Sequence, residues 1–552
     1  MTLTSNILTL ITFLPLVGMI ILMLLRDDRV IKQTAIYWSL LPLALSTYLW
    51  WMYDKAAGGF QFEQFAPWIR LGDQFTINFH VGVDGFSVPL IFLTCLLTTI
   101  SLWYSAGVIQ MRVKEYFALF MLLQAGMLGV FVSLDLFMFY VFFEVGLVPM
   151  YFLIGIWGGP RREYAAIKFF LYTLAGSVLM LLSLISVVYN TGSFSLVRGD
   201  MVSKFVSPAA AIPFLSNPTG TAATLAFVGF LVAMLIKMPS FPFHTWLPDA
   251  HVEAPTAGSI ILAGVLLKLG TYGMVRVVMP LFPSAFRAMA IPIGFLAFTS
   301  IVYGALVAMA QWDFKKLIAY SSVNHMGYVL LGLTASVVAV TAAKDGDAQT
   351  AANILQARQA GIDGAVMQMF AHGIITGALF LLVGLIYDTR THERDFRKLG
   401  GGLWRTVPRY GTFLIVAAFA SLGLPSLAGF VAEFLVFNGA FGVALNGNLP
   451  FLVLTGLSVL GIVFTAAFIL WKIIQMLLLG PQNETWIGTP DLTRSEMFML
   501  LPLVAFMFIY GLYPKWLLDY IHPTTTQLVT TMDTALSLPA APDAASAEAP
   551  AP

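Results

Sequence analysis

Four ionisable side chains lie inside long apolar stretches of the sequence, where lipid rejects charge. They are Glu144, Lys237, Lys268 and Glu433. A charged side chain at the centre of a bilayer costs about 2.5–3.5 kcal/mol on insertion scales, so such residues are functional candidates by default. Burial disfavours the charge of a lysine and a nearby carboxylate restores it, so a small movement of the carboxylate switches the lysine between binding and releasing a proton. We therefore expect these residues to carry protons.

A static ion pair that fixes helix register is the alternative for Glu144 and Lys237. Buried pairs are poor stabilisers compared with apolar residues of similar size, which argues against it. Lys268 is harder to explain structurally, because leucines flank it in Leu-Leu-Lys-Leu and no acid lies within a turn on its own stretch. Its depth also makes it difficult for the amine to reach the membrane surface.

Two histidines extend the series. His325 follows Ser321 by one helical turn and His372 follows Gln368 by one turn, so each helix carries a polar stripe suited to ordered water. Either histidine alone could be an ordinary core residue, and the two could instead be axial ligands of a b-type haem. The haem is disfavoured because no second pair of histidines accompanies them. The predicted proton relay comprises Glu144, Lys237, Lys268, His325, His372 and Glu433.

A polar segment at residues 244–255 follows the first of two predicted helix breaks. It contains His244, Asp249, His251 and Glu253 and no lysine or arginine. We interpret His244 and Asp249 as a cytoplasmic proton entrance. A tightly turned, capped loop is an equally good interpretation for His251 and Glu253.

The composition requires a membrane to hold these residues. Of 552 residues, 59% are hydrophobic and only 10% are charged, whereas soluble domains carry about 25% charged residues. The net charge of +1 gives no field that would attract nucleic acid. Cys95 is the only cysteine, which excludes intrachain disulfides and cysteine-ligated iron–sulfur or zinc sites. We expect no cofactor and no metal in this chain.

Apolar stretches long enough to cross a bilayer recur along the chain. They predict an all-α polytopic membrane protein with about 14 transmembrane helices, at 6–25, 33–51, 86–106, 116–133, 135–157, 166–189, 221–240, 257–279, 287–309, 317–341, 363–387, 411–440, 451–474 and 497–514. Pro239 and Pro425 should break spans seven and twelve, because proline removes a backbone donor and clashes with the preceding turn. The breaks lie five spans apart, which predicts two inverted five-helix repeats with a transport site at the broken helices.

These spans give five predicted segments. They are an N-terminal three-helix segment (1–115), a first five-helix repeat (116–280), a second, inverted repeat (281–480), a C-terminal helix with an external segment (481–536) and a disordered Ala/Pro tail (537–552). Residues 342–362 are expected to form an external loop, with at most a short helix.

The basic residues predict the orientation in the membrane. Loops on one side carry 18 of the 29 lysines and arginines, Lys472 among them, the other side carries 9, and the remaining two are intramembrane. The positive-inside rule makes the richer side cytoplasmic and places both termini outside.

Four motifs carry a family resemblance. They are Phe-Phe-Glu-Val-Gly-Leu-Val-Pro-Met-Tyr at 142–151, His-Thr-Trp-Leu-Pro-Asp-Ala-His-Val-Glu-Ala-Pro-Thr-Ala-Gly at 244–258, Tyr-Ser-Ser-Val-Asn-His at 320–325 and Leu-Pro-Ser-Leu-Ala-Gly-Phe-Val-Ala-Glu at 424–433. The chain resembles the antiporter-like membrane subunits of bacterial complex I, the NADH:quinone oxidoreductase, and within them the chain M group, the counterpart of mitochondrial subunit 4. The resemblance covers essentially all spans.

The resemblance implies a role for each relay residue. Glu144 and Lys237 would form a modulating pair, Lys268 the central relay, His325 and His372 the bridge between the halves, and Glu433 the terminal proton site. The implied partners are other complex I membrane subunits, especially the paralogous chains L and N, in a bacterial inner membrane. FMN, iron–sulfur clusters and quinone would belong to partner subunits. A related multi-component cation/proton antiporter or a membrane-bound hydrogenase is the alternative, and Glu433 in place of a lysine argues against it. Chains L and N carry lysine at this position, so Glu433 also marks the resemblance to chain M.

Overall fold

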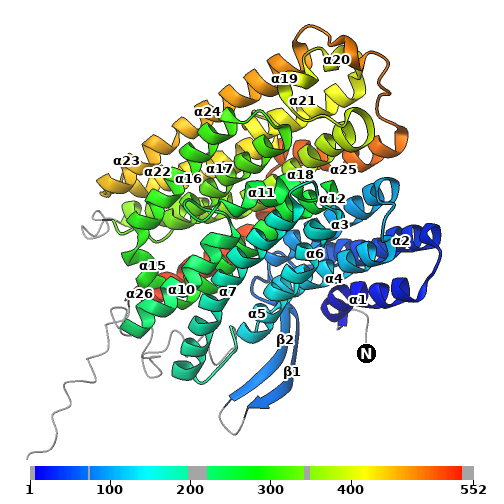
Figure 1. Cartoon of the computed structure of the whole chain (residues 1–552). Coiled ribbons are helices and arrows are strands. Elements are labelled where there is room, and N and C mark those ends of the chain that lie inside the picture. The colour runs from blue at the N-terminus through cyan, green and yellow to red at the C-terminus, as the bar shows by residue number, and fades with distance from the viewer. Residues whose placement is uncertain (1–5, 72–74, 197–220, 341–347, 538–552) are drawn as a thin grey trace, which may run out of the picture.

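The computed structural model is a bundle of helices with one β-hairpin projecting from an end (Figure 1). It describes residues 6–71, 75–196, 221–340 and 348–537. The predicted tail from residue 538 onward and residues 342–347 of the predicted loop lie outside these ranges. The all-α polytopic fold class is confirmed, since helices occupy all fourteen predicted ranges.

The first half of the chain consists of helices joined mostly by short connections. These helices are α1 (Ile7–Leu24), α2 (Asp28–Met52), α3 (Ser87–Val108), α4 (Val113–Val132), α5 (Leu136–Val145), α6 (Leu147–Trp157), α7 (Arg162–Thr191), α10 (Thr221–Lys237), α11 (Trp246–Glu253), α12 (Thr256–Ile261), the π-helix η3 (Leu262–Leu266), α13 (Leu267–Gly273), the π-helix η4 (Met274–Val278) and α14 (Met279–Leu281).

The second half continues in the same manner. It contains α15 (Pro283–Ala288), α16 (Ala290–Ala310), α17 (Phe314–Ala335), α18 (Ala348–Ile386), the π-helix η6 (Tyr387–Thr391), α19 (Phe396–Leu399), α20 (Leu403–Thr406), α21 (Pro408–Leu422), α22 (Ala428–Ala444), α23 (Leu449–Ser458), α24 (Leu460–Phe468), the π-helix η7 (Ile469–Leu479), the 3₁₀-helix η8 (Glu484–Trp486), α25 (Arg494–Leu512) and α26 (Lys515–Ser537).

Ten of the described helical segments are long and apolar enough to cross a membrane. Three shorter apolar helices, at 223–237, 408–422 and 428–444, belong to the two interrupted spans. Helix α17 is long enough to cross a membrane, but its mean hydropathy is too low for it to be counted with these ten. The run Ser-Ser-Val-Asn-His in its middle lowers that mean hydropathy. The polar run therefore marks a helix that must be covered by its neighbours, and α17 is buried along almost its whole length.

Both predicted helix breaks are present. Helix α10 ends at Lys237, two residues before Pro239, and α11 begins only at Trp246. The Trp246 indole donates a hydrogen bond to the carbonyl of Ile236 at 2.9 Å and so satisfies one acceptor that the break sets free. The second break separates α21 from α22 and contains Pro425.

Carboxylates at helix starts fix where several helices begin. Asp27 accepts hydrogen bonds from two backbone amides at the start of α2, Asp135 does the same for α5, and Asp313 caps α17. Each satisfies amides that have no partner within the helix.

Two elements differ from the sequence prediction. Strands β1 (Gln61–Leu71) and β2 (Phe75–Val83) form an antiparallel hairpin between α2 and α3, where no strand was predicted. Residues 348–362, predicted as loop, form the first turns of the 39-residue helix α18. Their alanine and glutamine content favours helix, and docking of α26 buries one side of these turns.

Helix α26 docks on α18 through three polar contacts. Arg358 pairs with Asp533 at 2.7 Å, Gln359 donates to the Thr526 hydroxyl at 3.1 Å, and His522 Nδ1 lies 2.7 Å from Asp363. The hydrogen bond with Asp363 raises the pKa of His522 above its ordinary 6.5. Because the folded-state pKa is raised, the pair stabilises docking fully below pH 6.5 and loses that contribution as pH rises through the folded value.

We expect amide protection in α26, corrected for intrinsic exchange, to be greater at pH 6 than at pH 9. The difference should be at most about fivefold, because partly exposed ion pairs contribute no more than about 1 kcal/mol. Hydrogen–deuterium exchange measures it. The His522→Gln variant serves as the control and should show no such pH dependence; a wild-type profile in that variant would contradict the assignment.

Candidate functional site

A line of buried ionisable side chains crosses the middle of the bundle. Lys268 on α13, His372 on α18, His325 on α17 and Glu433 on α22 are all at most 6% exposed. Lys268 Nζ lies 2.6 Å from His372 Nδ1, the rings of His372 and His325 have centroids 5.5 Å apart, and His325 Nδ1 lies 3.3 Å from Glu433 Oε1. Four residues from four helices thus form one continuous polar contact series.

The backbone around Lys268 is widened. The π-helix η3 immediately precedes α13, and Lys268 Nζ donates a hydrogen bond to the Ala263 carbonyl within η3 at 2.5 Å. A π-helical turn disturbs the regular α-helical pairing of carbonyls and is frequent at functional sites. The amine therefore has one fixed acceptor and one partner, His372, with which it can share a proton.

His325 has two competing partners at the same ring nitrogen. Its Nδ1 lies 3.2 Å from Gln368 Nε2 as well as 3.3 Å from Glu433 Oε1, while its Nε2 lies 3.1 Å from the Ser421 hydroxyl. An unprotonated Nδ1 accepts from the Gln368 amide, and a protonated Nδ1 donates to Glu433. Because both nitrogens of His325 are engaged, the arrangement does not suit an axial haem ligand.

The break between α21 and α22 makes room for Glu433. Gly423 adopts a positive φ of 80°, and a Cβ at this position would approach Glu433 Oε2 to 2.9 Å. Glycine tolerates this conformation at no steric cost. The break therefore allows the backbone of Gly423 to lie directly against the Glu433 carboxylate. The contact series that starts at Lys268 ends at Glu433.

Lys237 and Glu144 lie apart from this series. Lys237 is 3% exposed and its Nζ lies 4.6 Å from the centre of the Phe143 ring. Glu144 lies near Ser177 of α7 and within electrostatic range of Lys237, but among the described residues no ion pair of 4 Å or less joins the two. The static pair considered from the sequence is thus not formed in this conformation.

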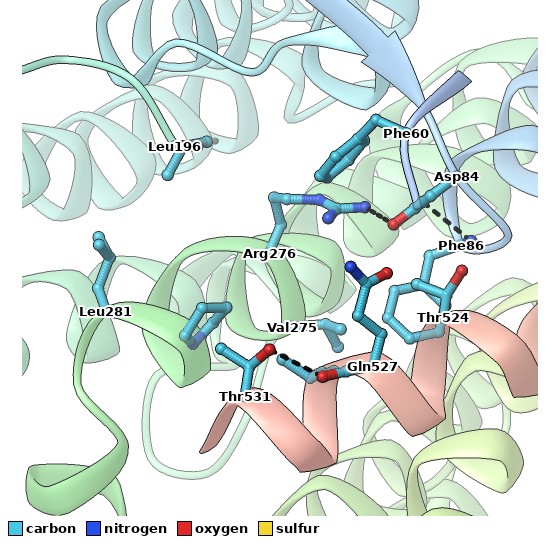
Figure 2. A pocket seen from close by; sticks show the side chains of 12 residues that line it. Phe60, Asp84, Phe86, Leu196, Val275, Arg276, Leu281, Thr524, Gln527 and Thr531 are labelled. Carbon is cyan, nitrogen blue, oxygen red and sulfur yellow. Dashed lines mark hydrogen bonds and ion pairs between the residues drawn. The ribbon is translucent and has the colours of Figure 1, made fainter. Parts of the chain in front are cut away.

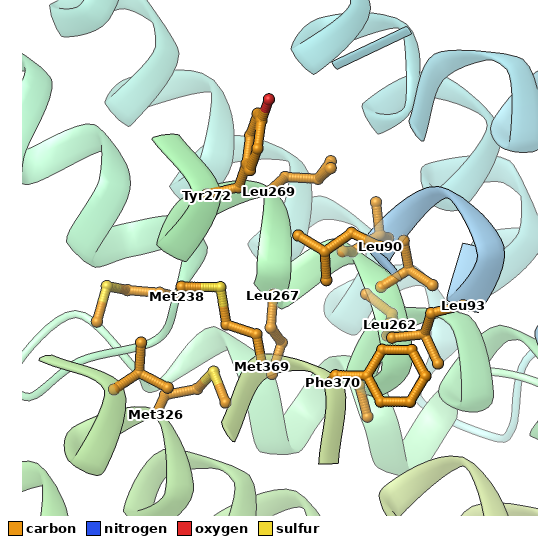
Figure 3. Close-up of a cluster of buried hydrophobic side chains, with 14 of the residues drawn as sticks. Leu90, Leu93, Met238, Leu262, Leu267, Leu269, Tyr272, Met326, Met369 and Phe370 are labelled. Carbon is orange, nitrogen blue, oxygen red and sulfur yellow. The ribbon is translucent and has the colours of Figure 1, made fainter. Parts of the chain in front are cut away.

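An apolar layer lies beside Lys268. Figure 3 shows Met238, Met326 and Met369, from three different segments, gathered near Leu267. Gly270 lets α13 approach the end of α10, since a Cβ there would meet Met238 N at 2.7 Å. No polar contact connects Lys237 with Lys268 in the part of the chain that the structure describes.

The predicted entrance contains more positive charge than its sequence suggested. Lys168 pairs with Asp249 at 2.6 Å and Arg161 lies 3.5 Å from the same carboxylate, both brought from α7 and the loop before it. His244 is only 2% exposed and stacks on Phe241. His251 is fully buried against Phe380, with neither ring nitrogen hydrogen-bonded.

A cavity of about 130 Å³ lies at the hairpin side of the bundle, away from the relay. Figure 2 shows Arg276 reaching toward Asp84 beside Phe60 and Gln527. Arg276 forms an ion pair with Asp84, and its Nε donates to Tyr272, which is one turn earlier on the same helical segment. This paired arginine is not available to hold an anion.

No group of three or more histidine, cysteine, aspartate or glutamate side chains among the described residues is arranged to hold a metal ion. The site consists of proton-binding groups in apolar surroundings, held on helices that are broken or widened beside them. The geometry defines a class: a polytopic membrane protein of the antiporter-like type, with a buried lysine–histidine–glutamate series.

Comparison with known proteins identifies the family. Residues 133–344 and 350–465 match the family model for the transmembrane region of NADH:quinone oxidoreductase and Mrp antiporter proteins. NADH-quinone oxidoreductase subunit M of Rhodobacter capsulatus is 41% identical over 533 residues, which are 95% of this chain and 96% of that protein. The chain belongs to the NADH-quinone oxidoreductase subunit M family.

Solved structures show the same fold. A chain of respiratory complex I from Thermus thermophilus with bound NADH superposes with a TM-score of 0.78 at 28% identity, covering 95% of this chain and 99% of that one. A chain of the Mrp complex from Dietzia sp. DQ12-45-1b has a TM-score of 0.76 at 20% identity, covering 97% and 100%. The second likeness concerns the fold alone.

Proposed function

We propose that this chain moves protons through the membrane as the chain M subunit of a proton-pumping NADH:quinone oxidoreductase. The observation that carries the proposal is the series Lys268, His372, His325 and Glu433, which joins two halves of the bundle. Lys268 and His372, and His325 and Glu433, lie 2.6 Å and 3.3 Å apart, and a ring contact with centroids 5.5 Å apart connects the two histidines. Charges so costly in lipid are retained because protons transfer along them. NADH oxidation, with FMN, iron–sulfur clusters and quinone, takes place in partner subunits, and chains L and N are the paralogous membrane neighbours.

Glu144 and Lys237 form the control point of the pathway. When Glu144 approaches Lys237, it stabilises the ammonium form; when it withdraws, the buried lysine releases its proton toward Lys268. The 4 Å or greater separation seen here corresponds to the withdrawn arrangement. His244 and Asp249 supply protons to Lys237 from the cytoplasmic side, and both chain termini lie on the periplasmic side of a bacterial inner membrane.

The two five-helix segments, 116–280 and 281–480, act as inverted halves. Each contains one of the broken helices, and the relay crosses from Lys268 in the first to Glu433 in the second. Transport sites in such folds lie where broken helices meet near the midplane.

Alanine at Glu144 or Lys237 tests the proposal. We expect the assembled enzyme to lose proton pumping and coupled NADH:quinone turnover by about 100-fold or more, the lower end of the range for loss of a positioned acid or base. The measurements are dye quenching in liposomes containing the purified complex, and a native gel for assembly. Glu163→Ala on α7, outside the series, is the matched control. Full pumping by an assembled Lys237→Ala enzyme would overturn the proposal.

A further inference from the structure

Among the described residues, two buried lysines lie outside the relay, Lys315 and Lys472, and Lys315 donates a hydrogen bond to the Ala254 carbonyl. Lys472, in the π-helix η7, is 0% exposed. Its Nζ lies 3.0 Å from the centre of the Trp312 ring and 4.0 Å from that of Trp471. Among the described residues this Nζ has no hydrogen-bond partner. Arg397 stacks on the same Trp312 ring at 5.1 Å and faces the loops of the predicted cytoplasmic side.

A purely structural role explains this lysine poorly. A cation on an aromatic face is stabilised modestly, whereas burying an ammonium without hydrogen bonds costs more free energy, because the group loses its hydration. Arginine stacks on indoles better and distributes its charge over a plane. A lysine is suited to this position if it has to give up its proton. Lys268, the other lysine in a π-helical context, has the same combination of full burial and a widened backbone.

Buried polar atoms lie between Lys472 and Glu433. Among the described residues, the side-chain oxygens of Tyr328, Asn324 and Thr465 are buried without a hydrogen bond of regular geometry, and Tyr328 and Asn324 lie within interaction range of each other. Tyr328 lies within electrostatic range of Glu433. A helical threonine ordinarily donates to the carbonyl one turn earlier, as Thr376 does here, so the free hydroxyl of Thr465 points to another ligand.

Gly461 of α24 opens space at this cluster. A Cβ there would come within 3.1 Å of the Tyr328 hydroxyl and 3.4 Å of Asn324 Nδ2. Thr465 follows one turn later on the same face of α24, and Lys472 two turns beyond it. Buried polar groups that lack protein partners are satisfied by ordered water. The ligand class that fits this cluster is therefore water, or a hydrated proton.

We propose that Tyr328, Asn324, Thr465 and Lys472 form a second proton branch that connects Glu433 with the loops near Arg397. The proposal rests on the proposed function of the relay. The Lys472 ammonium gives a proton to water held at Thr465 and Asn324; that water gives a proton to the Tyr328 oxygen as the phenol passes its own proton to the Glu433 carboxylate; the neutral amine then takes a proton from solvent at the loop side. The seven residues from Thr465 to Lys472 span about 10 Å of helix, so more than one water molecule connects them.

Lys472→Arg separates the two roles. Arginine keeps a stacked cation on Trp312 but does not release its proton at any pH the protein tolerates. With Lys472→Arg and with Lys472→Met, we expect the purified complex in liposomes to transfer about tenfold fewer protons per NADH oxidised. Normal pumping by Lys472→Arg would show a static aromatic clamp and overturn the branch.

Thr465→Val keeps the side-chain shape and removes the hydroxyl, and Tyr328→Phe removes only the phenol oxygen. Both should lower pumping in the same direction, while Thr299→Val, whose hydroxyl bonds its own helix, should not. If Lys472→Arg fails to assemble, these two variants decide: wild-type pumping by both would overturn the branch. Normal pumping in them with lost pumping in Lys237→Ala would reject the branch and leave the proposed function standing.

Discussion

Replacement of Lys268 by methionine is expected to abolish proton pumping and leave the subunit assembled. Methionine has nearly the volume of lysine, and an apolar residue in place of a buried charge is often neutral or stabilising. The Ala263 carbonyl loses its hydrogen-bond donor, which lowers the free energy of unfolding by about 1–3 kcal/mol. That loss is too small to prevent folding of a large membrane domain, but no group remains to hand a proton to His372.

The size of the effect follows from the position of Lys268 at the centre of the series. Loss of a positioned proton donor lowers rates by about 100-fold to 10,000-fold, so pumping by Lys268→Met should fall below detection in liposomes. Lys268→Arg is the informative companion, because it retains the positive charge and cannot release it. Pumping by either variant at a tenth of the wild-type rate or more would remove Lys268 from the pathway.

The candidate relay residues could be selected from the sequence because a charged residue is rare within a membrane-spanning stretch. Lys268 and Glu433 stand out in apolar sequence without any knowledge of their neighbours, and the glycine and proline beside Glu433 mark the break that the structure shows. The contacts between them were not predictable. His372 meets Lys268 across 104 positions of sequence, and only the packing of α18 against η3 and α12 sets that distance.

The sequence misplaced groups whose partners are remote. The sequence predicts Lys472 to be a loop residue on the basic side, because it lies near the end of its span. In the structure its side chain is 0% exposed and lies against Trp312 and Trp471. The sequence around Asp249 contains no lysine or arginine, but Lys168, which lies 81 positions earlier in the chain, contacts its carboxylate. In both cases the charge environment is set by tertiary contacts, which no local pattern reveals.

The hairpin and the first turns of α18 were missed for a different reason. The span search follows apolar length, and neither element is a membrane-spanning stretch. In the hairpin, successive side chains of each paired strand point to opposite faces. The first turns of α18 are stabilised by the contacts of Arg358 and Gln359 with α26. Amphipathic periodicity, rather than mean hydropathy, is the signal for such elements.

Glu433→Gln is expected to stop transfer at the end of the series while preserving its geometry. The glutamine amide has the shape of the carboxyl and can still bond His325, but it cannot take up a proton. We expect pumping to fall by about 100-fold, as for other positioned acids, with assembly and detergent stability near wild type. The measurement is proton uptake into liposomes driven by NADH oxidation.

The two partners of His325 make this variant more informative than a simple deletion. In the wild type, a proton on Nδ1 faces Glu433 and its absence favours the Gln368 amide. In Glu433→Gln both neighbours are amides, so no carboxylate remains to accept a hydrogen bond from a protonated Nδ1. Nuclear magnetic resonance of labelled histidine can follow the hydrogen bonding of this nitrogen. Glu433→Asp, which keeps the charge at a shorter reach, should retain part of both the Nδ1 hydrogen bond and the pumping; equal behaviour of the Asp and Gln variants would mean that the carboxylate charge is not what His325 responds to.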